Sequence, residues 1–465
     1  MTTETTTPRV RGDMKSIAGE HGFVPLRVEG RVPPELEGTL VRTGPGLYES
    51  FGRRIGHSFE ADGAISGVRL SNGRAEGAVR LIESDGLLRE RALGRPLFGS
   101  RANRLRRIGN VLQRKTKTTG NTSLMAWQHR LFALVESSRP IEISPDDLST
   151  LGETRLGGAL TTPFSAHPHT VVGRKALYNF GIEYGRQSAL VLYELPFHGR
   201  ARRMFSVPLK QPVLLHDFAA TDRHFVFFVS PARIRIARAL LGIGDFASIL
   251  AWEPDAGTEV IVVPIDDPTR VVRFDVPAFF QWHFAGCWER GSELIVHYVR
   301  YDDMTTFSQL RSCGVTEQGK LHEAVINPAK RTMRSEPVWD GASEFPVIDP
   351  RRAGADYATV LLTSDDRDRR ALARVNLETR RAQVVRLAEG EHGSEVVFVP
   401  RGPHASEGDG FGLCLVYDAQ TDKSHVAILD TARWEEGPIA RCFFETHVPM
   451  SFHGTWLPRR SFSGA

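Results

Sequence analysis

Cysteine is scarce in this chain, and long apolar runs are missing. Its 465 residues include four cysteines, Cys287, Cys313, Cys414 and Cys442, and none is spaced as Cys-x-x-Cys. This excludes a disulfide framework and disfavours a cysteine zinc site. No run approaches the roughly 18 apolar residues of a membrane-spanning helix. The first residues are polar and lack the apolar centre of a signal peptide. We therefore predict a reduced, cytoplasmic location.

A large excess of charge of one sign is also missing. The chain has 59 Lys and Arg against 55 Asp and Glu, a formal net charge of +4. A balance this close gives no argument for nucleic-acid binding. Basic clusters occur at residues 101–117 and 233–238, and we interpret both as solvated faces.

Short apolar segments between turn residues are abundant. Residues 225–229, which are followed by Ser230 and Pro231, predict a buried strand. Four consecutive strands are predicted at residues 359–363, 371–377, 382–387 and 395–400. We interpret these four as one propeller blade. The density of strands predicts an all-β protein, a β-propeller that forms one domain over residues 21–465 after a flexible tail at residues 1–20.

The best candidate for a helix covers residues 232–252, where apolar residues are interleaved with arginines. An apolar face with a basic flank is typical of a helix on a membrane surface. It is equally typical of a helix packed on the body of a protein, so both interpretations stay open. Gly242 and Gly244 weaken a long continuous helix. Peripheral membrane contact is a prediction for this segment.

Four of the 16 histidines share one setting, in which each stands among apolar or small residues beside a predicted strand. They are His167, His216, His283 and His453. Such a histidine is costly to bury unless its ring nitrogens are satisfied. The wide spacing excludes a local metal motif but suits a propeller, whose inner strands all face one axis. Four neutral imidazoles meeting there would bind a divalent transition metal.

Metal-bound histidines need their second ring nitrogen held, usually by a carboxylate or a carbonyl. Three glutamates, Glu136, Glu344 and Glu407, stand in apolar contexts that suit this role. Each can also be interpreted as a solvated turn residue. That interpretation is weakest for Glu136, which ends the apolar run at residues 132–135.

Together these motifs resemble those of the carotenoid cleavage oxygenase family. The matching stretches are residues 38–46 (Gly-Thr-Leu-Val-Arg-Thr-Gly-Pro-Gly), 57–63, 121–122, 133–136, 166–168, 216–219, 283–285, 344–346, Glu407 with 409–410, and 452–454. No single stretch is decisive, but their order and context are specific, and they cover most of the chain.

The resemblance implies a seven-bladed β-propeller, with a few short helices and loops capping the face above the metal. In the family, the four histidines hold one non-haem Fe(2+) on the axis. Dioxygen is added across an alkene, and two carbonyl products are released. The resemblance thus implies a dioxygenase that cleaves a carotenoid or apocarotenoid, with a stilbene or another phenylpropenoid as the alternative substrate.

The resemblance also assigns partners to the ligands. Glu136 should hold His216, and Glu344 should hold His283. Glu407 should hold His453, which leaves His167 without a carboxylate. His169 rivals His167, because residues i and i+2 share a strand face, but the family position favours His167.

Residues that flank the ligands line the substrate tunnel in the family. The matching positions are Phe59, Val135, Leu214, Trp282 and Phe345. All are apolar, which suits a long hydrophobic polyene. Relatives that cleave hydroxystilbenes carry a lysine at the position of Val135 and a tyrosine upstream. No tyrosine occurs here between Tyr48 and Tyr178, so a carotenoid or apocarotenoid is favoured over a stilbene.

Two further classes of function compete with the oxygenase. A propeller that only binds other molecules would be favoured by the loss of a histidine, and none of the four is lost. A propeller hydrolase with an axial calcium would want several oxygen ligands in place of four imidazoles. The chain departs from the family pattern at Gly286, where Asn is frequent, and at Gly408, where an acid is usual. Neither change removes a ligand.

Overall fold

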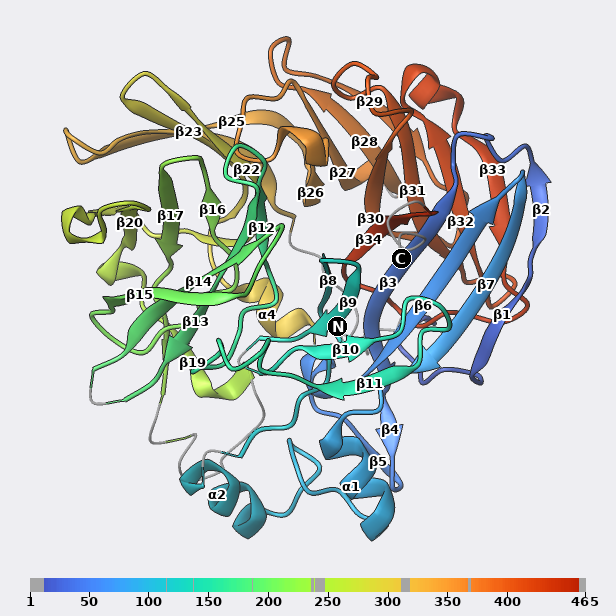
Figure 1. The fold of residues 1–465 in the computed structure, drawn as a ribbon, viewed down its shortest axis with the longest axis horizontal. Coiled ribbons are helices and arrows are strands. Elements are labelled where there is room, and N and C mark those ends of the chain that lie inside the picture. The colour runs from blue at the N-terminus through green and yellow to red at the C-terminus, as the bar shows by residue number, and fades with distance from the viewer. Residues whose placement is uncertain are drawn as a thin grey trace, which may run out of the picture.

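Seven β-sheets stand in a ring around a central axis (Figure 1). The structure, a computed structural model, describes residues 12–113, 115–136, 138–185, 187–235, 238, 247–310, 318–366 and 369–459. Each sheet of the ring has four or five strands and forms one blade. The predicted seven-bladed propeller is confirmed.

Five blades are made of strands that are close in sequence, named here from the axis outward. They are β8 (Ser123–Trp127), β9 (Arg130–Leu134), β10 (Ile141–Ile143) and β11 (Thr150–Glu153); β12 (His169–Val171), β13 (Ala176–Glu183), β14 (Ala189–Pro196) and β15 (Arg202–Pro208); β16 (Ala219–Ala220), β17 (His224–Val229), β20 (Thr258–Pro264) and β21 (Val272–Val276); β22 (Phe280–Arg290), β23 (Glu293–Tyr301), β24 (Lys320–Asn327) and β25 (Thr332–Ala342); and β26 (Glu344–Val347), β27 (Thr359–Asp366), β28 (Arg369–Asn376) and β29 (Arg381–Arg386).

The other two blades join strands from opposite ends of the chain. One consists of β30 (Glu391–Pro400), β31 (Gly410–Asp418), β32 (Lys423–Asp430), β33 (Pro438–Phe443) and β2 (Arg27–Gly30), and the other of β34 (Gly454–Pro458), β3 (Gly38–Leu47), β6 (Asp62–Ser71), β7 (Arg74–Leu81) and β1 (His21–Pro25). Strand β34 pairs with β3, and β2 pairs with β33. Two separate strand pairings therefore close the ring.

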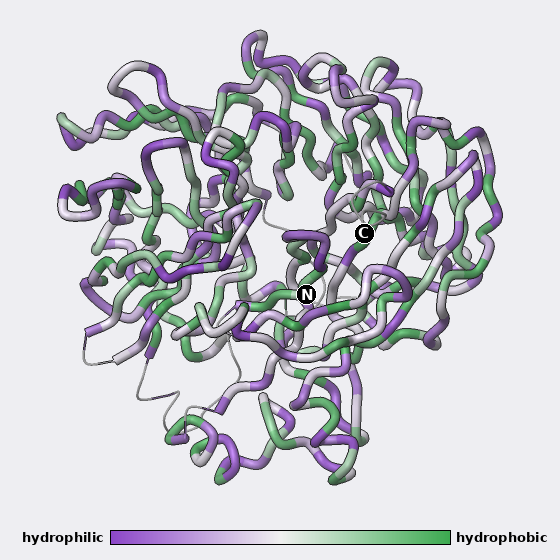
Figure 2. Tube along the Cα trace, viewed as in Figure 1, coloured by the Kyte–Doolittle hydropathy of each residue, from purple (hydrophilic) through white to green (hydrophobic). Residues whose placement is uncertain are grey.

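Neighbouring blades pack on both faces of each sheet, which explains why the strands are apolar without alternation. In β17, Phe225 and Phe227 pack towards the blade of β12, whereas Val226 and Phe228 pack towards the blade of β22. Successive side chains of a strand point to opposite faces, so both sets are buried. Figure 2 shows hydrophobic segments within the blades and hydrophilic turns around the outside.

Helices are few and short. Those in the described part of the chain are α1 (Asp85–Leu93), α2 (Arg104–Leu112) and α4 (Thr305–Gln309), with 3-10 turns at Ser58–Glu60, Ala247–Ile249, Pro254–Ala256, Pro268–Arg270, Pro350–Arg352 and Thr431–Glu436. Residues 84–113 form a helical extension that projects beyond the ring near the small hairpin of β4 (Glu49–Ser50) and β5 (Arg53–Arg54) (Figure 1). Among the described residues, no helix is long and apolar enough to cross a membrane.

Two predicted elements are wrong in detail. The helix predicted for residues 232–252 begins and ends as strands, because β18 (Ala232–Ile234) pairs with β19 (Leu250–Trp252). Residues 236, 237 and 239–246 lie outside the described residues. The four strands predicted as one blade belong to two, because β30 is the inner strand of the next sheet. The predicted strand positions themselves are confirmed.

The second half of the predicted tail packs on the body. Met14 is buried beside Tyr48 and Met450, and the Met450 amide donates to the carbonyl of Asp13. Residues 1–11 lie outside the described part of the chain.

Candidate metal centre and active site

The four predicted histidines lie within or just before the inner strands of four different blades. His167 stands two residues before β12, His216 three residues before β16, His283 within β22, and His453 immediately before β34. Their rings gather on the axis, with centroids 4.3 Å apart for His167 and His216 and 4.8 Å apart for His283 and His453. The prediction that they converge agrees with this geometry.

The facing ring nitrogens are close enough to share one ion. Nε2 of His283 lies 3.3 Å from Nε2 of His216 and 3.1 Å from Nε2 of His453. Ligand atoms of His167, His216 and His283 all lie within 4.8 Å of one another. The buried Nε2 of His167 has no hydrogen-bond partner.

Carboxylates face the other nitrogen of three rings. Nδ1 of His216 lies 2.5 Å from Oε1 of Glu136, and Nδ1 of His283 donates to Oε2 of Glu344 at 2.6 Å. These two pairs are the predicted ones. Glu344 also accepts a hydrogen bond from the Tyr301 hydroxyl at 2.8 Å.

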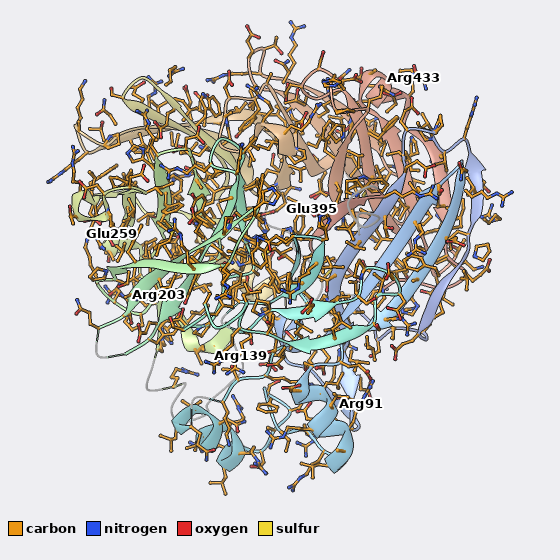
Figure 3. All side chains as sticks on the ribbon, in the orientation of Figure 1. Arg91, Arg139, Arg203, Glu259, Glu395 and Arg433 are labelled. Atoms are coloured by element: carbon orange, nitrogen blue, oxygen red, sulfur yellow. The ribbon has the colours of Figure 1, made fainter. Side chains whose placement is uncertain are left out.

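The third pair differs from the prediction. Nδ1 of His453 donates to Oε1 of Glu395 at 2.8 Å, so the assignment of Glu407 to His453 is wrong. Glu407 instead accepts from the amide of Thr359, in a turn away from the ring cluster. Glu395 heads the apolar inner segment of β30, where strand geometry aims it at the axis. Figure 3 labels Glu395 near the centre of the ring, whereas Glu259 and Arg433 lie near its edge.

Breaks in strand pairing aim several of these side chains. The register shifts between Gln281 and Phe284 in β22 and between Gly393 and Val396 in β30. Such bulges re-aim a side chain next to an active site. A third shift follows Glu344 in β26, where Phe345 adopts a φ of 50°. A left-handed φ is unfavourable for a bulky residue, and here it brings the Phe345 ring against His283.

The electrostatics of the cluster keep the carboxylates ionised. Burial alone would raise the pKa of Glu136, Glu344 and Glu395. The adjacent imidazole acts together with further hydrogen bonds and, for Glu395, with the charge of Arg42, and these outweigh burial, so the pKa of each carboxyl group lies below its ordinary value. Burial, followed by the charge of the His216 ring, lowers the pKa of His167 well below its ordinary value. His167 is therefore neutral, as a metal ligand must be.

The donor set fits a transition metal. A carboxylate can only accept, so each Nδ1 that faces a glutamate carries its proton, and Nε2 of the neutral ring carries a lone pair. When the three rings are neutral, the lone pair on Nε2 of His283 faces those of His216 and His453 at 3.3 Å and 3.1 Å. A cation at the ordinary metal–nitrogen distance of about 2.1 Å would relieve this repulsion.

His169, the rival ligand, has a different role. Its Nε2 lies 2.7 Å from Oδ1 of Asp217, outside the cluster. The buried Asp217 also accepts hydrogen bonds from the amides of Phe218 and Phe284, at 2.8 Å and 2.9 Å. It thus ties the segment of His216 to the strand of His283, a function that the sequence had not revealed.

Two cavities adjoin the cluster. The first is lined by Phe59, Trp282 and Phe345 together with His216, His283 and His453. The second is lined by Phe59, Val135 and Glu136 and runs to α2, where Val111 lines it. Four of the five predicted lining residues therefore face a cavity, and their apolar surfaces agree with the prediction.

Leu214 is the exception among the predicted lining residues. It packs on the apolar cluster around Trp282 and Phe307 and is not among the residues that line either cavity. Its contact with the cavity is through Trp282.

The two departures at glycine have local causes. A Cβ on Gly286 would lie 2.9 Å from the ring of Tyr357, so this side chain leaves no room for Asn. Gly408 has a φ of 71°, a left-handed conformation that favours glycine.

Comparisons with known proteins agree with the fold and the cluster. Residues 15–458 match the family model described as RPE65, retinal pigment epithelial membrane protein. The apocarotenoid-15,15'-oxygenase of Synechocystis sp. is 30% identical over 92% of this chain and 92% of its own length. The isoeugenol monooxygenase of Pseudomonas putida is 25% identical over 97% of this chain and 98% of its own.

A solved structure, described as cobalt-substituted Synechocystis ACO, is similar over most of the chain. It has a TM-score of 0.88 and 28% sequence identity, and the match covers 96% of this chain and 98% of that chain. A metal site in that protein therefore accepts cobalt.

Proposed function

The chain belongs to the family of RPE65 and the carotenoid cleavage oxygenases, and on this premise we propose that it is an Fe(2+)-dependent dioxygenase. The proposed reaction is cleavage of a carbon–carbon double bond in a carotenoid or apocarotenoid, which yields two carbonyl products. The observation that carries the proposal is the set of four imidazoles around one point, three of them backed by carboxylates.

His167, His216, His283 and His453 are the proposed ligands. Iron, when bound, supplies the redox chemistry that makes dioxygen reactive towards an alkene. In the neutral rings of His216, His283 and His453, the facing glutamates hold the single proton on Nδ1, which leaves Nε2 as the nitrogen available to a metal. Fixing the rings in advance means that no reorganisation is needed when the metal binds.

The apolar walls of the cavity support a polyene substrate. The ring of Phe59 stacks at 6.4 Å on His216, and that of Phe345 stacks at 5.1 Å on His283. Flat aromatic surfaces beside the ligands exclude water and hold a flat, conjugated chain next to the axis. The reaction needs no charged group on the substrate.

A phenolic substrate of the isoeugenol or stilbene type is the second candidate, because an isoeugenol monooxygenase is among the relatives. A buried phenol oxygen needs a polar partner. Val135 supplies none where hydroxystilbene-cleaving relatives carry a lysine. The Tyr301 hydroxyl lies in the cavity but already donates to Glu344. The polyene is therefore the favoured substrate.

Membrane contact is proposed for the cavity mouth near α2 as well as for residues 232–252. In α2, Leu105 is 83% and Leu112 70% exposed, next to Arg104 and Arg106. Exposed leucines beside arginines are typical of a helix that lies on an anionic lipid surface. A polyene could then pass from the lipid into the cavity that α2 helps to line.

Sedimentation with anionic liposomes tests this contact. Leu105→Asp combined with Leu112→Asp should abolish most of the bound fraction. The matched control is Leu151→Asp, because Leu151 is 62% exposed on a blade edge and should leave binding unchanged. Equal binding by the double variant and the wild type would contradict the proposal.

Metal analysis and a substrate panel test the reaction. The purified protein should hold about one iron per chain. Incubation with carotenoids, apocarotenals, stilbenes and isoeugenol should give aldehydes from a polyene, identified by mass. A chain without metal that retains carotenoids uncleaved would point to a binding module, and aldehydes formed only from phenolic substrates would favour the second candidate.

A further inference from the structure

A buried arginine stands behind one of the ligand pairs. Arg42, on β3, is 1% exposed. Arginine is almost never buried to this degree unless its charge and its donors are paired. The partners of this guanidinium therefore indicate what it is there to do.

All three groups of donors on Arg42 reach the segments that carry His453 and Glu395. Nε donates to Oγ of Ser451 at 2.7 Å, and Nη2 donates to the carbonyl of Phe452 at 2.9 Å. Nη1 donates to the carbonyl of Glu395 at 2.8 Å and lies 3.9 Å from its Oε2. One side chain thus fixes the residues just before His453 and the main chain of its carboxylate partner.

The surrounding backbone leaves space for this guanidinium. A Cβ on Gly454 would lie 2.8 Å from Cγ and 3.2 Å from Nη1 of Arg42. A Cβ on Gly44 would lie 2.1 Å from the carbonyl oxygen of Met450. The segment 450–454 therefore lies directly on β3, and the amide of Thr43 donates to the carbonyl of His453 at 3.0 Å.

The three ligand pairs differ in what supports the carboxylate. Glu344 accepts from the hydroxyl of Tyr301, and Glu136 accepts from the hydroxyl of Thr122 at 3.3 Å. Glu395 has a buried cation beside it and accepts from the amide of Gly454 at 2.8 Å. His453 also stands immediately before β34, the strand that pairs with β3, on which Arg42 lies.

We propose that Arg42 is a positioning residue for the metal centre, which holds His453 and Glu395 in register with the other three ligands. It acts through the carbonyl of Phe452, the hydroxyl of Ser451 and the main chain of Glu395. This inference rests on the proposed metal site. The positioning role requires a planar group that can donate in three separate directions. Lysine carries the same charge but lacks that fork.

Binding of Co(2+) to metal-free protein tests the inference without any substrate. Affinity and the visible absorption spectrum of the bound ion are measured for the wild type, Arg42→Lys, Arg42→Met, Ser451→Ala and Glu395→Gln. Loss of a partner behind a metal ligand typically lowers affinity about 10–100-fold. Arg42→Lys should weaken binding about tenfold or more and change the spectrum in the same direction as Glu395→Gln. Arg42→Met should weaken it further.

A second buried arginine provides the matched control. Arg101 is 4% exposed, and its guanidinium pairs with Asp62 and with the hydroxyl of Ser50, not with one of the four histidines or its carboxylate. Arg101→Lys should leave the affinity and spectrum of Co(2+) unchanged even where it lowers Tm. If Arg42→Met does not fold, Ser451→Ala still removes one acceptor with little change in volume and should shift the spectrum.

Wild-type affinity and spectrum in Arg42→Lys would overturn the inference. An equal change of the Co(2+) spectrum in Arg101→Lys and Arg42→Lys would also overturn it, because the effect of Arg42 would then come only from the stability of the whole fold. In the double variant of Arg42→Lys and Glu395→Gln, the loss of affinity should be smaller than the product of the two single losses. Failure of the wild type to bind Co(2+) would instead overturn the proposed metal site.

Discussion

The axis of the ring and the helical extension of residues 84–113 are held in opposite ways. On the axis, the four histidines lie within or just before the inner strands of four blades, and His167, His216 and His283 are buried. In the extension, α2 has no buried residue, and a cluster of buried charges anchors α1 beside a few apolar residues such as Leu87 and Leu97. The contrast indicates that the proposed reacting centre belongs to the ring. The cavity that leads to it is bounded by α2, whose sequence can vary at little cost to the stability of the fold.

The charged part of the anchor consists of three buried side chains. Nζ of Lys117 lies 2.5 Å from Oδ1 of Asp62 and 2.6 Å from Oε2 of Glu90. Glu90 in turn accepts from the amides of Leu97 and Phe98. Removing one partner would leave buried charges unpaired, which is strongly destabilising locally. The two regions can therefore be disturbed separately.

The largest effect is expected on the axis. His283→Ala removes the ring that faces both His216 and His453, so metal retention should be lost and cleavage should fall by at least about 1,000-fold. Iron content and product formation are the measurements. His297→Gln is the control, since His297 is also buried beside a carboxylate, Glu323, but lies on β23, one strand outward from the inner strand of its blade. Full activity in His283→Ala would disprove the assignment.

The next effect separates two glutamates. Glu395→Gln should lower metal affinity about 10–100-fold, because the Nδ1 proton of His453 loses its charged acceptor. Glu407→Gln should leave affinity unchanged, because Glu407 contacts Thr359 in a turn. Titration of metal-free protein with Fe(2+) under nitrogen measures both. A larger loss in the Glu407 variant would favour Glu407 as the partner of His453.

A smaller effect is expected from loosening the extension. Lys117→Met should leave Asp62 and Glu90 unpaired and speed up limited proteolysis within residues 94–117 several-fold. Iron content should stay at the wild-type level, because no ligand is touched. Mass analysis of the fragments, alongside metal analysis, measures both. Loss of iron in this variant would show that the two regions are not independent.

The smallest effect concerns the outer end of the strand that carries His283. Burial would raise the pKa of Glu289, but hydrogen bonds from His224, Thr221 and Arg223 lower it from 4.5 to about 2. A lowered pKa means that the stabilisation is present above pH 4.5 and is lost as the pH falls towards 2. Glu289→Gln should therefore cost about 1 kcal/mol at pH 7 and almost nothing near pH 2.

Urea unfolding at several pH values measures this difference. Iron binding at pH 7 should be unaffected by Glu289→Gln, because the carboxylate lies at the rim of the blade. A stability difference that persists unchanged at pH 2 would contradict the assignment of the lowered pKa.

The sequence predicted which four histidines converge, because each has a distinct signature. A histidine in an apolar setting beside a buried strand must have its ring nitrogens satisfied. Four such histidines, in the order found in one family, are best explained by a shared metal site. Glu395 was missed although it heads a predicted strand at residues 395–400. Its partner is a loop residue 58 positions away, and only the closed ring brings the two together. Glu407, with its glycine-rich turn, matched the family pattern but does not face the axis.

Elements whose shape depends on distant contacts were predicted less well. The boundary between two blades falls between β29 and β30, where sequence shows only one more turn among many. The ends of residues 232–252 form a hairpin because β18 and β19 pair with each other, which overrides the local helical pattern. The helices α1 and α2 were not predicted, although Ser84 and Asn103 cap them and Gly94 ends α1 in a left-handed conformation.

The position of His453 next to the last strand has a consequence for folding. His453 is joined directly to β34, so the fourth ligand reaches the axis only when β34 pairs with β3. A nascent chain with three histidines in place has an incomplete site and an open ring at the same moment. Any ion that prefers four ligands to three favours pairing of the last strand, and the free energy of its binding adds to that of closure. Metal supply would then help to decide how many chains finish folding.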